Sequence, residues 1–195
     1  MRKNKIGIVV PYRNRREHLN HFIPSITTTL KEQNIDYEVI IVEQADDKPF
    51  NRGKLLNVGV KRAKKLKCNY VALHDVDMLP QKVDYSIVDR PTHLATKFTS
   101  DHKEKRVIFD GYFGGVTLFP IMDYYKVNGY SNEYWGWGYE DDDLLFRCKE
   151  NLFDFNTKQT PIKTSNSAGL EFNGWDSEVK IPMKFGLDNY TILLS

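Results

Sequence analysis

Tyr70-Val71-Ala72-Leu73-His74-Asp75-Val76-Asp77 is a short apolar run that leads into two aspartates separated by one residue. A run of this length and composition predicts a buried β-strand. Two similar runs, Ile6–Val10 and Tyr37–Val42, precede it, and each is followed by apolar residues at helical spacing. Strand and helix therefore alternate, which predicts an α/β sheet flanked by helices. Such sheets bind ligands at the carboxyl ends of their strands, so Asp75 and Asp77 are expected at a ligand-binding edge.

The segments between these strands predict amphipathic helices. Over residues 19–30 the apolar side chains share one helical face, and Pro24 is expected to kink this helix or to start its second half. Over residues 55–66 apolar residues form one face and lysines occupy the other. Three further elements are expected later in the chain: a strand over Tyr112–Phe119 interrupted by Gly114-Gly115, a helix over Asp142–Lys149, and an edge strand over Tyr190–Leu194.

The composition indicates one domain and argues against several classes of protein. With 195 residues, 41% of them hydrophobic, the chain can build one core, so residues 1–195 are expected to form a single domain. The net charge of +2 is the difference between 28 basic and 26 acidic residues and gives no signal for a nucleic-acid partner. Cys68 and Cys148 form no Cys-x-x-Cys pair, so neither a disulfide scaffold nor a thiolate zinc site is expected.

Asp75 and Asp77 have the chemistry of a metal and phosphate site. If the segment stays extended, residues two apart project to the same side, and both carboxylates face one point beyond the strand. Hard oxygen ligands suit Mg²⁺ or Mn²⁺ that bridges a diphosphate, because phosphate oxygens and water complete the coordination shell. The alternative is a solvated turn after a strand, where aspartate is common for backbone reasons.

Two basic segments are expected at the same edge of the sheet. Arg13 and Arg15 follow the first strand and offer planar donors suited to phosphate or a uracil edge. The segment Phe50-Asn51-Arg52-Gly53-Lys54 lies just before the second helix, whose N-terminus also favours an anion. Both segments would also be compatible with ordinary solvated loops, but their position beside Asp75 and Asp77 favours a phosphate-binding role.

The stretch Tyr134-Trp135-Gly136-Trp137-Gly138-Tyr139-Glu140-Asp141-Asp142-Asp143 combines aromatic rings with four consecutive acids. Aromatic rings stack on the apolar faces of sugars, while carboxylates accept hydrogen bonds from sugar hydroxyls and can remove a proton from one of them. The structural alternative places the aromatics in the core and the acids in the first turn of a helix. Because four adjacent acids repel one another and exceed what a helix start requires, a sugar site is the favoured interpretation.

Five motifs occur in the order found in one enzyme family. They are Pro11-Tyr12-Arg13-Asn14-Arg15, the run from Phe50 to Gly59, His74-Asp75-Val76-Asp77, Tyr112-Phe113-Gly114-Gly115-Val116, and the run from Trp135 to Asp143. The chain thereby resembles the catalytic domain of the β-1,4-galactosyltransferase family over roughly residues 6 to 150. The His-Asp-Val-Asp spelling and the late Gly186-Leu187-Asp188-Asn189 resemble the xylosyl-acceptor branch of that family.

The resemblance implies a GT-A-like, Rossmann-like mixed sheet flanked by helices, and inverting transfer of galactose from UDP-galactose to an acceptor-sugar hydroxyl. It makes Asp141 the general base and Asp77 the metal ligand, with Mn²⁺ or Mg²⁺ as cofactor. The residues implied in donor binding are Pro11, Arg13, Arg15, Phe50, Arg52, Asp75, Val76, Tyr112 and Trp137. The residues implied in acceptor binding are Tyr112, Trp137, Glu140, Asp141 and Asp142. Tyr112 matches the position that in this family helps to choose galactose over its N-acetylated relative.

The chain departs from the family at the metal site. The family supplies a histidine after the acidic motif, whereas no histidine follows His102 here. His74 alternates away from the aspartates if the strand stays extended, and it is expected to be structural. The substitute ligands considered are Glu171, which is preferred, Asp176 and Asn166; otherwise Asp77 and the diphosphate hold the metal alone. The stretch at about 164–180 has the glycine and serine content of a mobile lid, although surface-loop behaviour explains it equally well.

Several alternatives remain open from the sequence. The same fold could use another donor, such as UDP-GalNAc, UDP-glucose or UDP-glucuronate, and the missing histidine leaves room for a non-catalytic sugar-binding module. A nucleotidyltransferase is disfavoured because no glycine-rich phosphate loop follows the first strand.

The apolar run after the basic N-terminus is too short for a signal peptide or a membrane span. A soluble cytoplasmic enzyme is therefore expected, although the excised catalytic domain of an anchored enzyme would look similar.

Overall fold

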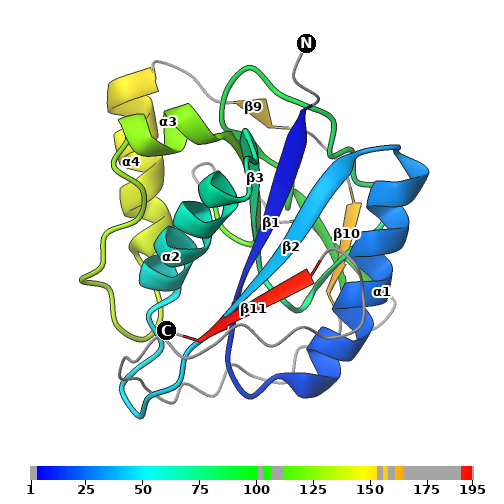
Figure 1. Cartoon of the computed structure of the whole chain (residues 1–195), viewed down its shortest axis with the longest axis horizontal. Helices are drawn as coiled ribbons and strands as arrows, with labels where there is room; N and C mark the ends of the chain where they lie inside the picture. The colour runs from blue at the N-terminus through cyan, green and yellow to red at the C-terminus, as the bar shows by residue number, and fades with distance from the viewer. Residues whose placement is uncertain are drawn as a thin grey trace.

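The central feature of the fold is a mixed β-sheet. The computed structural model describes residues 4–100, 103–106, 112–152, 156–157, 161–164 and 190–194. Within these residues, seven strands form one sheet in the order β11-β2-β1-β3-β8-β5-β9 (Figure 1). The strands of this sheet are β1 (Lys5–Tyr12), β2 (Asp36–Glu43), β3 (Tyr70–His74), β5 (Thr92–His93), β8 (Val116–Pro120), β9 (Asn156–Thr157) and β11 (Tyr190–Leu194).

Four helices and a smaller sheet complete the described part of the chain. The helices are α1 (Arg16–Glu32), α2 (Arg52–Lys65), α3 (Ile121–Lys126) and α4 (Glu140–Leu152). The smaller sheet has the order β4-β10-β6-β7 and consists of β4 (Met78–Pro80), β10 (Pro161–Thr164), β6 (Lys97–Ser100) and β7 (Lys103–Arg106). No helix in the described ranges has the length and apolar character that crossing a membrane would require.

The sheet topology brings four loops to one edge. β11, β2, β1 and β3 run parallel, so the segments that follow β1, β2 and β3 leave the sheet at the same edge. β8 runs antiparallel to β3, with Val116 opposite His74. The segment that precedes β8 therefore meets the segment that follows β3, which is the arrangement that positions the site.

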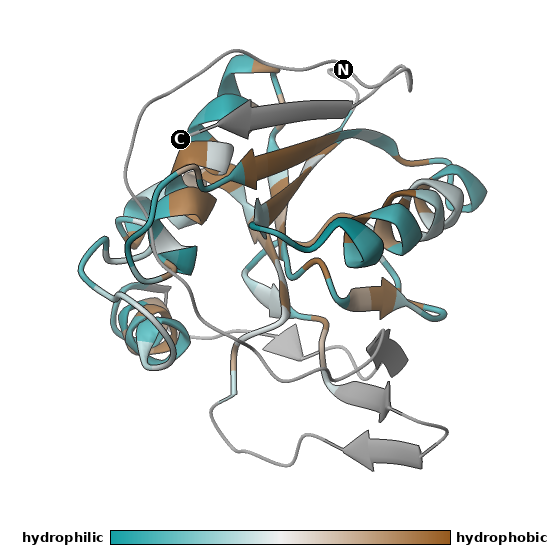
Figure 2. Ribbon diagram, turned by 90° about the horizontal axis from the view of Figure 1, so that it is seen from below, coloured by the Kyte–Doolittle hydropathy of each residue, from teal (hydrophilic) through white to brown (hydrophobic). Residues whose placement is uncertain are grey.

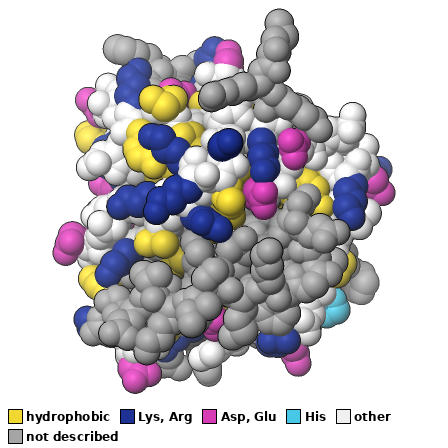
Figure 3. All heavy atoms as spheres, in the orientation of Figure 1, with side chains coloured by type: hydrophobic (Ala, Val, Ile, Leu, Met, Phe, Trp, Pro, Cys, Tyr) yellow, Lys and Arg dark blue, Asp and Glu magenta, His cyan; other side chains and the backbone are white. Residues whose placement is uncertain are grey.

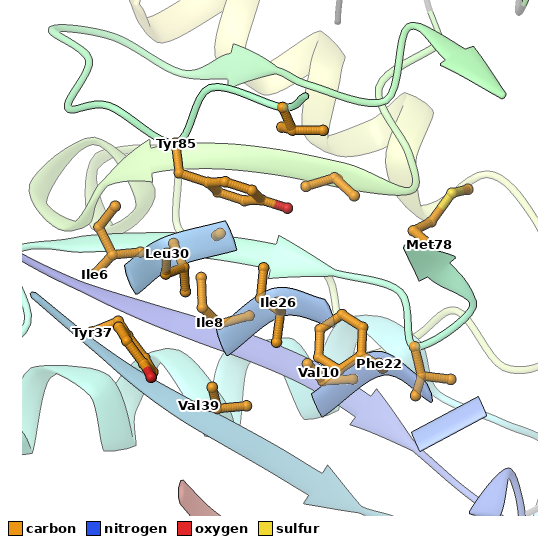
Figure 4. Close-up of a cluster of buried hydrophobic side chains, with 14 of the residues drawn as sticks. Ile6, Ile8, Val10, Phe22, Ile26, Leu30, Tyr37, Val39, Met78 and Tyr85 are labelled. Carbon is orange, nitrogen blue, oxygen red and sulfur yellow. The ribbon is translucent and has the colours of Figure 1, made fainter. Parts of the chain in front are cut away.

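The core lies in two layers, one on each face of the sheet. On one face, α1 packs against β1 and β2, and Phe22, Ile26 and Leu30 meet Ile6 and Ile8 (Figure 4). On the other face, α2, α3 and α4 cover β1, β3 and β8 (Figure 1). Figure 2 shows the hydrophobic residues concentrated in the central strands and on the helix sides that face them. Burial of these surfaces on both faces explains why the strands read as continuous apolar runs.

The helix expected around Pro24 is one helix, α1, so Pro24 does not start a separate second half. Pro24 is exposed, which lets its ring lie on the solvent side. β1 extends beyond the apolar run Ile6–Val10, through Pro11 to Tyr12. Since β3 pairs with β1 only as far as Val9, the strand beyond Val9 pairs with β2 alone, where the missing N–H of a proline is tolerated.

The predicted boundaries of the later elements also need correction. The strand predicted over Tyr112–Phe119 begins only at Val116, because Gly115 adopts a positive φ of 74°. The predicted helix over Asp142–Lys149 is longer and spans Glu140–Leu152. The edge strand Tyr190–Leu194 is confirmed as β11, which pairs with β2 at one edge of the sheet. Cys68 and Cys148 are both buried and free, as expected.

Helix α2 connects the core to the edge of the sheet that carries the site. Its N-cap is Asn51, whose side chain accepts a hydrogen bond from the backbone N–H of Lys54 at 2.9 Å. Gly59 lets the helix approach β1 closely, since a Cβ there would lie 2.2 Å from Val9 Cγ1. The outer face carries the predicted lysines, and Lys and Arg side chains gather over this helix in Figure 3.

Gly59→Ala should destabilise the protein by about 1–3 kcal/mol, because the added methyl group must displace a strand side chain. The clash with Val9 outweighs the gain of about 1 kcal/mol in helix propensity that alanine brings. Urea unfolding followed by circular dichroism measures the change. Lys61→Ala on the exposed face of the same helix serves as the control and should leave stability nearly unchanged. Equal or greater stability of Gly59→Ala would contradict the close packing of α2 on β1.

Candidate active site

The two aspartates follow β3 in a turn. The backbone N–H of Asp75 donates to the carbonyl of Gly115 at 2.9 Å, and Met78 N–H donates back to the carbonyl of Asp75 at 3.1 Å. The expectation that this segment stays extended was therefore wrong, because the chain turns at Val76 and Asp77 to start β4. Val76 is buried in the core and fixes the turn. The two carboxylates are consequently held by different arginines.

Arg52 joins the aspartate turn to the acidic run. Its Nε donates to Asp75 Oδ1 at 2.7 Å, and its Nη1 donates to Asp141 Oδ1 at 2.7 Å. Glu140 Oε1 lies 3.6 Å from the same Nη1. Burial opposes the charge of this guanidinium, but the carboxylates of Asp141 and Asp75 outweigh it and hold the pKa of Arg52 well above its ordinary value. Arg52 therefore stays charged and holds segments 23 and 89 residues away in sequence.

Asp75 lies in a strongly charged environment. Burial raises the pKa of its carboxyl, Arg52 opposes this shift, and the carboxylates of Asp77 and Asp141 add to it. Asp77 and Asp141 therefore lie close enough to Asp75 for their charges to act on it. A cationic or hydrogen-bonding ligand placed beside them would relieve their mutual repulsion.

The four acids at the start of α4 have four different surroundings. Burial, together with the neighbouring Asp141 carboxylate, raises the pKa of Glu140, and Arg52 opposes this rise. Asp142 is exposed. Asp143 accepts from Arg147 Nη2 at 2.5 Å, one helical turn later, and is therefore structural. All four also lie at the helix N-terminus, where negative charge is stabilised. The acidic run thus stabilises the start of α4 and also supplies the carboxylates of Glu140 and Asp141 that lie beside Arg52.

Asp141 is the best-defined member of the acidic run. Its Oδ1 accepts from Arg52 and also from the hydroxyl of Tyr130 at 2.7 Å. Its Oδ2 faces Gly114, since a Cβ on that glycine would lie 2.3 Å from Oδ2 and 3.0 Å from the Tyr112 ring. A side chain at position 114 would therefore collide with the carboxylate. Glycine lets Asp141 and Tyr112 pack directly against the backbone of the segment that precedes β8.

Tyr112 lies beside these acids, as the sequence predicts. Its ring packs edge-on against His93, with 5.3 Å between ring centroids, and His93 Nε2 lies 2.8 Å from the Gly114 carbonyl oxygen. Burial raises the pKa of Tyr112 well above its ordinary value, and the carboxylates of Asp75 and Asp141 raise it further. Its phenol therefore stays protonated and can donate a hydrogen bond to a ligand.

The two basic segments border the same edge. Arg15 Nη1 lies 3.7 Å from Asp77 Oδ2, and Arg13 Nη1 donates to the Lys48 carbonyl at 3.2 Å. Pro11 is buried at the end of β1, and the Phe50 carbonyl accepts from Gly136 N–H at 2.8 Å. The loops that follow β1 and β2 are therefore linked to the aspartate turn and to the aromatic segment.

The structure does not bring Trp137 into this group. Its side chain is 76% exposed, and no ring contact joins it to another residue in the part of the chain that the structure describes. Its neighbour Trp135 is instead approached by Lys48 and Lys54, whose Nζ atoms lie 5.8 and 5.7 Å from the ring centroid. Gly136 and Gly138 both have positive φ and place the two indoles differently. A role of Trp137 in sugar binding stays a prediction.

His74 is structural, which confirms the expectation. It is fully buried, and its Nε2 lies 2.8 Å from the Tyr85 hydroxyl oxygen while its ring meets Phe22 edge-on. Burial lowers the pKa of His74 to about 4, so the imidazole is neutral at physiological pH. The ring lies in the core, and its Nδ1 lies 3.0 Å from the backbone carbonyl oxygen of Asp75, so His74 also supports the aspartate turn.

The described residues supply only part of a metal site. Among them, no group of three or more His, Cys, Asp and Glu side chains could hold a metal ion. Asp77 offers a hard carboxylate oxygen, which suits Mn²⁺ or Mg²⁺ when a diphosphate contributes further oxygens. The substitute ligands Asn166, Glu171 and Asp176 lie outside the described residues, as does the predicted lid at about 164–180 apart from Thr164.

Sequence reasoning missed Tyr130 and His93. Tyr130 contacts Asp141 across 11 residues, and no periodicity or motif marks it. His93 reaches the site through the short strand β5, which was not predicted because two residues carry no detectable pattern. The contact between Tyr130 and Asp141 depends on the path of the loop between α3 and α4, and the spacing of the aromatic residues near Gly129 does not predict that path.

Family models and individual relatives both match this chain to glycosyltransferases. Two family models match the chain: the N-terminal region of glycosyl transferase group 7 over residues 1–88, and the N-terminal domain of galactosyltransferase over residues 94–167. Xylosylprotein 4-beta-galactosyltransferase from Caenorhabditis elegans is 34% identical over 164 residues, which are 84% of this chain and 56% of that protein. Beta-1,4-galactosyltransferase 4 from Homo sapiens is 42% identical over 149 residues, which are 74% of this chain and 42% of that protein. The chain thus spans about half the length of these curated relatives.

A solved structure supports the fold over nearly the whole chain. A mutant of Drosophila β-1,4-galactosyltransferase 7, in complex with manganese, UDP-Gal and xylobiose, superimposes with a TM-score of 0.82 at 27% identity. The match covers 98% of this chain and 93% of that chain. The expected GT-A glycosyltransferase fold is therefore confirmed. With both family models, these relatives and the site at the sheet edge in agreement, the chain belongs to the β-1,4-galactosyltransferase family.

Proposed function

We propose that this chain catalyses inverting transfer of galactose from UDP-galactose to an acceptor-sugar hydroxyl. The observation that carries the proposal is the pair of bonds from Arg52, which link Asp75 of the donor-side turn to Asp141 at the start of α4. A base beside a phosphate-binding edge is what a single-displacement glycosyl transfer requires. The relatives named galactosyltransferases and the Drosophila complex with UDP-Gal support the choice of donor.

In the proposed mechanism Asp141 acts as the general base. Its Oδ2, which faces Gly114, removes the proton of the acceptor hydroxyl while that oxygen attacks the anomeric carbon. Attack occurs from the face opposite the diphosphate, so the anomeric configuration inverts as the bond to UDP breaks. Arg13 and Arg15 at the mouth of the site offset the negative charge that develops on the leaving diphosphate. Tyr112 beside the acids donates a hydrogen bond to the sugar.

We propose Mn²⁺ as the metal, held by Asp77 together with the diphosphate. When bound, the ion neutralises charge on the leaving group. Asp77 lies in the turn after β3 and within the influence of Asp75, so a divalent cation there also offsets carboxylate repulsion. The manganese in the Drosophila complex supports this choice at the level of the family. Glu171 is proposed as a further protein ligand in place of the histidine that the family supplies after its acidic motif.

We propose a xylose-containing acceptor as the first candidate. The names of one relative and one solved neighbour, xylosylprotein 4-beta-galactosyltransferase and a complex with xylobiose, favour the xylosyl branch. The name of the human relative, which has the higher identity, gives no acceptor, so sugars other than xylose serve as comparison acceptors. Acceptor choice depends on the loop around Trp137 and Asp142, both of which are exposed and can reach a sugar.

UDP release from a panel of UDP-sugars tests the proposed function. With UDP-galactose, Mn²⁺ and a xyloside, turnover should exceed that with UDP-GalNAc, UDP-glucose or UDP-glucuronate, and chelation should lower it at least about tenfold. The product anomer, determined by NMR, should be inverted relative to the donor. Sugar binding without UDP release would overturn the proposal in favour of a binding module. Release of pyrophosphate would indicate a nucleotidyltransferase instead.

A further inference from the structure

Tyr130 lies at the centre of the site although no motif contains it. It stands in the loop between α3 and α4 and is only 2% exposed. Its hydroxyl donates to Asp141 Oδ1 at 2.7 Å and accepts from Arg52 Nη1 at 3.2 Å. The Arg52 guanidinium also lies over the Tyr130 ring, 5.6 Å from its centroid. Tyr130 therefore touches both groups that connect the donor side of the site to the acceptor side.

The backbone of Tyr130 is fixed from two helices. Its N–H donates to Asn57 Oδ1 of α2 at 3.0 Å, and Asn57 Nδ2 donates to the Tyr130 carbonyl at 2.8 Å. Asn57 Oδ1 also accepts from the hydroxyl of Tyr124 in α3 at 2.6 Å. Gly53 lets the tyrosine pack against the start of α2, because a Cβ there would lie 2.9 Å from Tyr130 Cβ. The hydroxyl is thus presented to Asp141 from a rigid support.

The two oxygens of Asp141 consequently have different roles. Oδ1 receives both donors, one from Tyr130 and one from Arg52, whereas Oδ2 faces Gly114. A carboxylate held at one oxygen by two donors from different elements cannot rotate freely about its Cβ–Cγ bond. Its other oxygen therefore keeps a fixed direction, packed against Gly114.

Tyr130 remains a donor in this environment. Burial, together with the Asp141 carboxylate, raises the pKa of Tyr130 well above its ordinary value, although Arg52 opposes the shift. The phenol therefore stays protonated and donates its hydrogen bond to Asp141. The other charged or titratable groups that influence Asp141 or its neighbours come from several elements: Arg52, Glu140, Asp75, Tyr112 and His93.

We propose that Tyr130 is a positioning residue that orients the Asp141 carboxylate, so that Oδ2 meets the acceptor hydroxyl. The inference rests on the proposed function, in which Asp141 is the base. It assigns to Tyr130 no contact with either sugar. Its effect is on the chemical step, since a base displaced by a fraction of an ångström or turned away from its proton loses efficiency.

Tyr130→Phe tests the inference, with Tyr85→Phe as the matched control. Both variants remove one buried hydroxyl that makes a hydrogen bond, but only the Tyr130 hydroxyl touches Asp141. Tyr130→Phe should lower kcat by about 10- to 100-fold while leaving the KM for the UDP-sugar and the affinity for UDP nearly unchanged. Tyr85→Phe should lower the thermal midpoint to a similar extent and keep kcat close to wild type, because its hydroxyl contacts His74 in the core. An unchanged kcat in Tyr130→Phe, or equal losses of kcat in both variants, would overturn the inference.

A second measurement separates failure of this inference from failure of the proposed function. Crystal structures of the wild type and of Tyr130→Phe show the Asp141 side chain directly. The carboxylate should rotate away from its wild-type orientation, or lose order, in the variant. If the wild type releases no UDP from any donor, the proposed function fails, and the crystal structures still decide the positioning role. An Asp141 side chain in the same orientation in both structures would overturn it.

Discussion

Asp141→Asn should lower turnover by about 10²–10⁴-fold, the range that a general base contributes. Asparagine has nearly the same shape, and its oxygen can still accept from Arg52 and Tyr130, so the site should keep its geometry. The amide cannot take up the acceptor proton, and the loss should therefore fall on the chemical step. UDP-galactose turnover measures kcat, and calorimetry measures the affinity for UDP, which should stay near the wild-type value.

Asp143→Asn is the matched control for this prediction. Asp143 stands two residues later in the same helix and pairs with Arg147 instead of Arg52. An asparagine there can still accept a hydrogen bond from Arg147, so both stability and turnover should change little. If Asp141→Asn lost UDP affinity and turnover to the same degree, Asp141 would be a binding or structural residue and its assignment as the base would be wrong.

Arg52→Met should produce the largest loss of stability among the substitutions considered. Methionine keeps much of the apolar stem but leaves Asp75 and Asp141 facing each other without their cation. Removing one partner from a buried ion pair costs about 3–5 kcal/mol, and the partial exposure of these carboxylates places the expected loss near about 3 kcal/mol. Urea unfolding measures the change, and turnover should fall with it, since the turn after β3 loses its link to α4.

The loss caused by Arg52→Met should shrink as the pH falls. The pKa of Asp75 is raised in the folded protein above its ordinary value of 3.8, so the folded state binds more protons than the unfolded state between these two pKa values. Stability contributed by this group is therefore lost as the pH rises toward the folded pKa, and removal of Arg52 makes that loss larger. Unfolding at pH 5 and at pH 8 compares the two conditions. Arg90→Met, in the exposed pair with Asp89, should show no such dependence.

The sequence allowed the fold to be predicted where one pattern determines one element. The apolar runs that became β1, β2 and β3 are buried on both faces, so burial and strand propensity agree. The alternation of these strands with α1 and α2 then implies a shared carboxyl edge. The short strands β4 and β5 could not be predicted, since two or three residues carry no periodicity.

The candidate site was predictable in its residue types and less so in its contacts. The sequence identified Asp75, Arg52 and Asp141 individually. That the Arg52 guanidinium binds both carboxylates could not be predicted, because it depends on the relative placement of α2 and α4. The direction of Asp75 and Asp77 could not be foreseen, because a turn stabilised by Gly115 replaces the extended strand. Trp137 lies on the surface because the flanking glycines with positive φ, Gly136 and Gly138, determine its direction.

The Arg52 bridge also bears on the order in which the chain folds. It closes contacts across 23 and 89 residues of sequence, and contacts of such long range form late because the entropy of loop closure opposes them. The aspartate turn also bonds to Gly115, so it too is complete only after the segment before β8 has joined β3. The two acidic clusters therefore come together late in folding, when α4 docks beside α2.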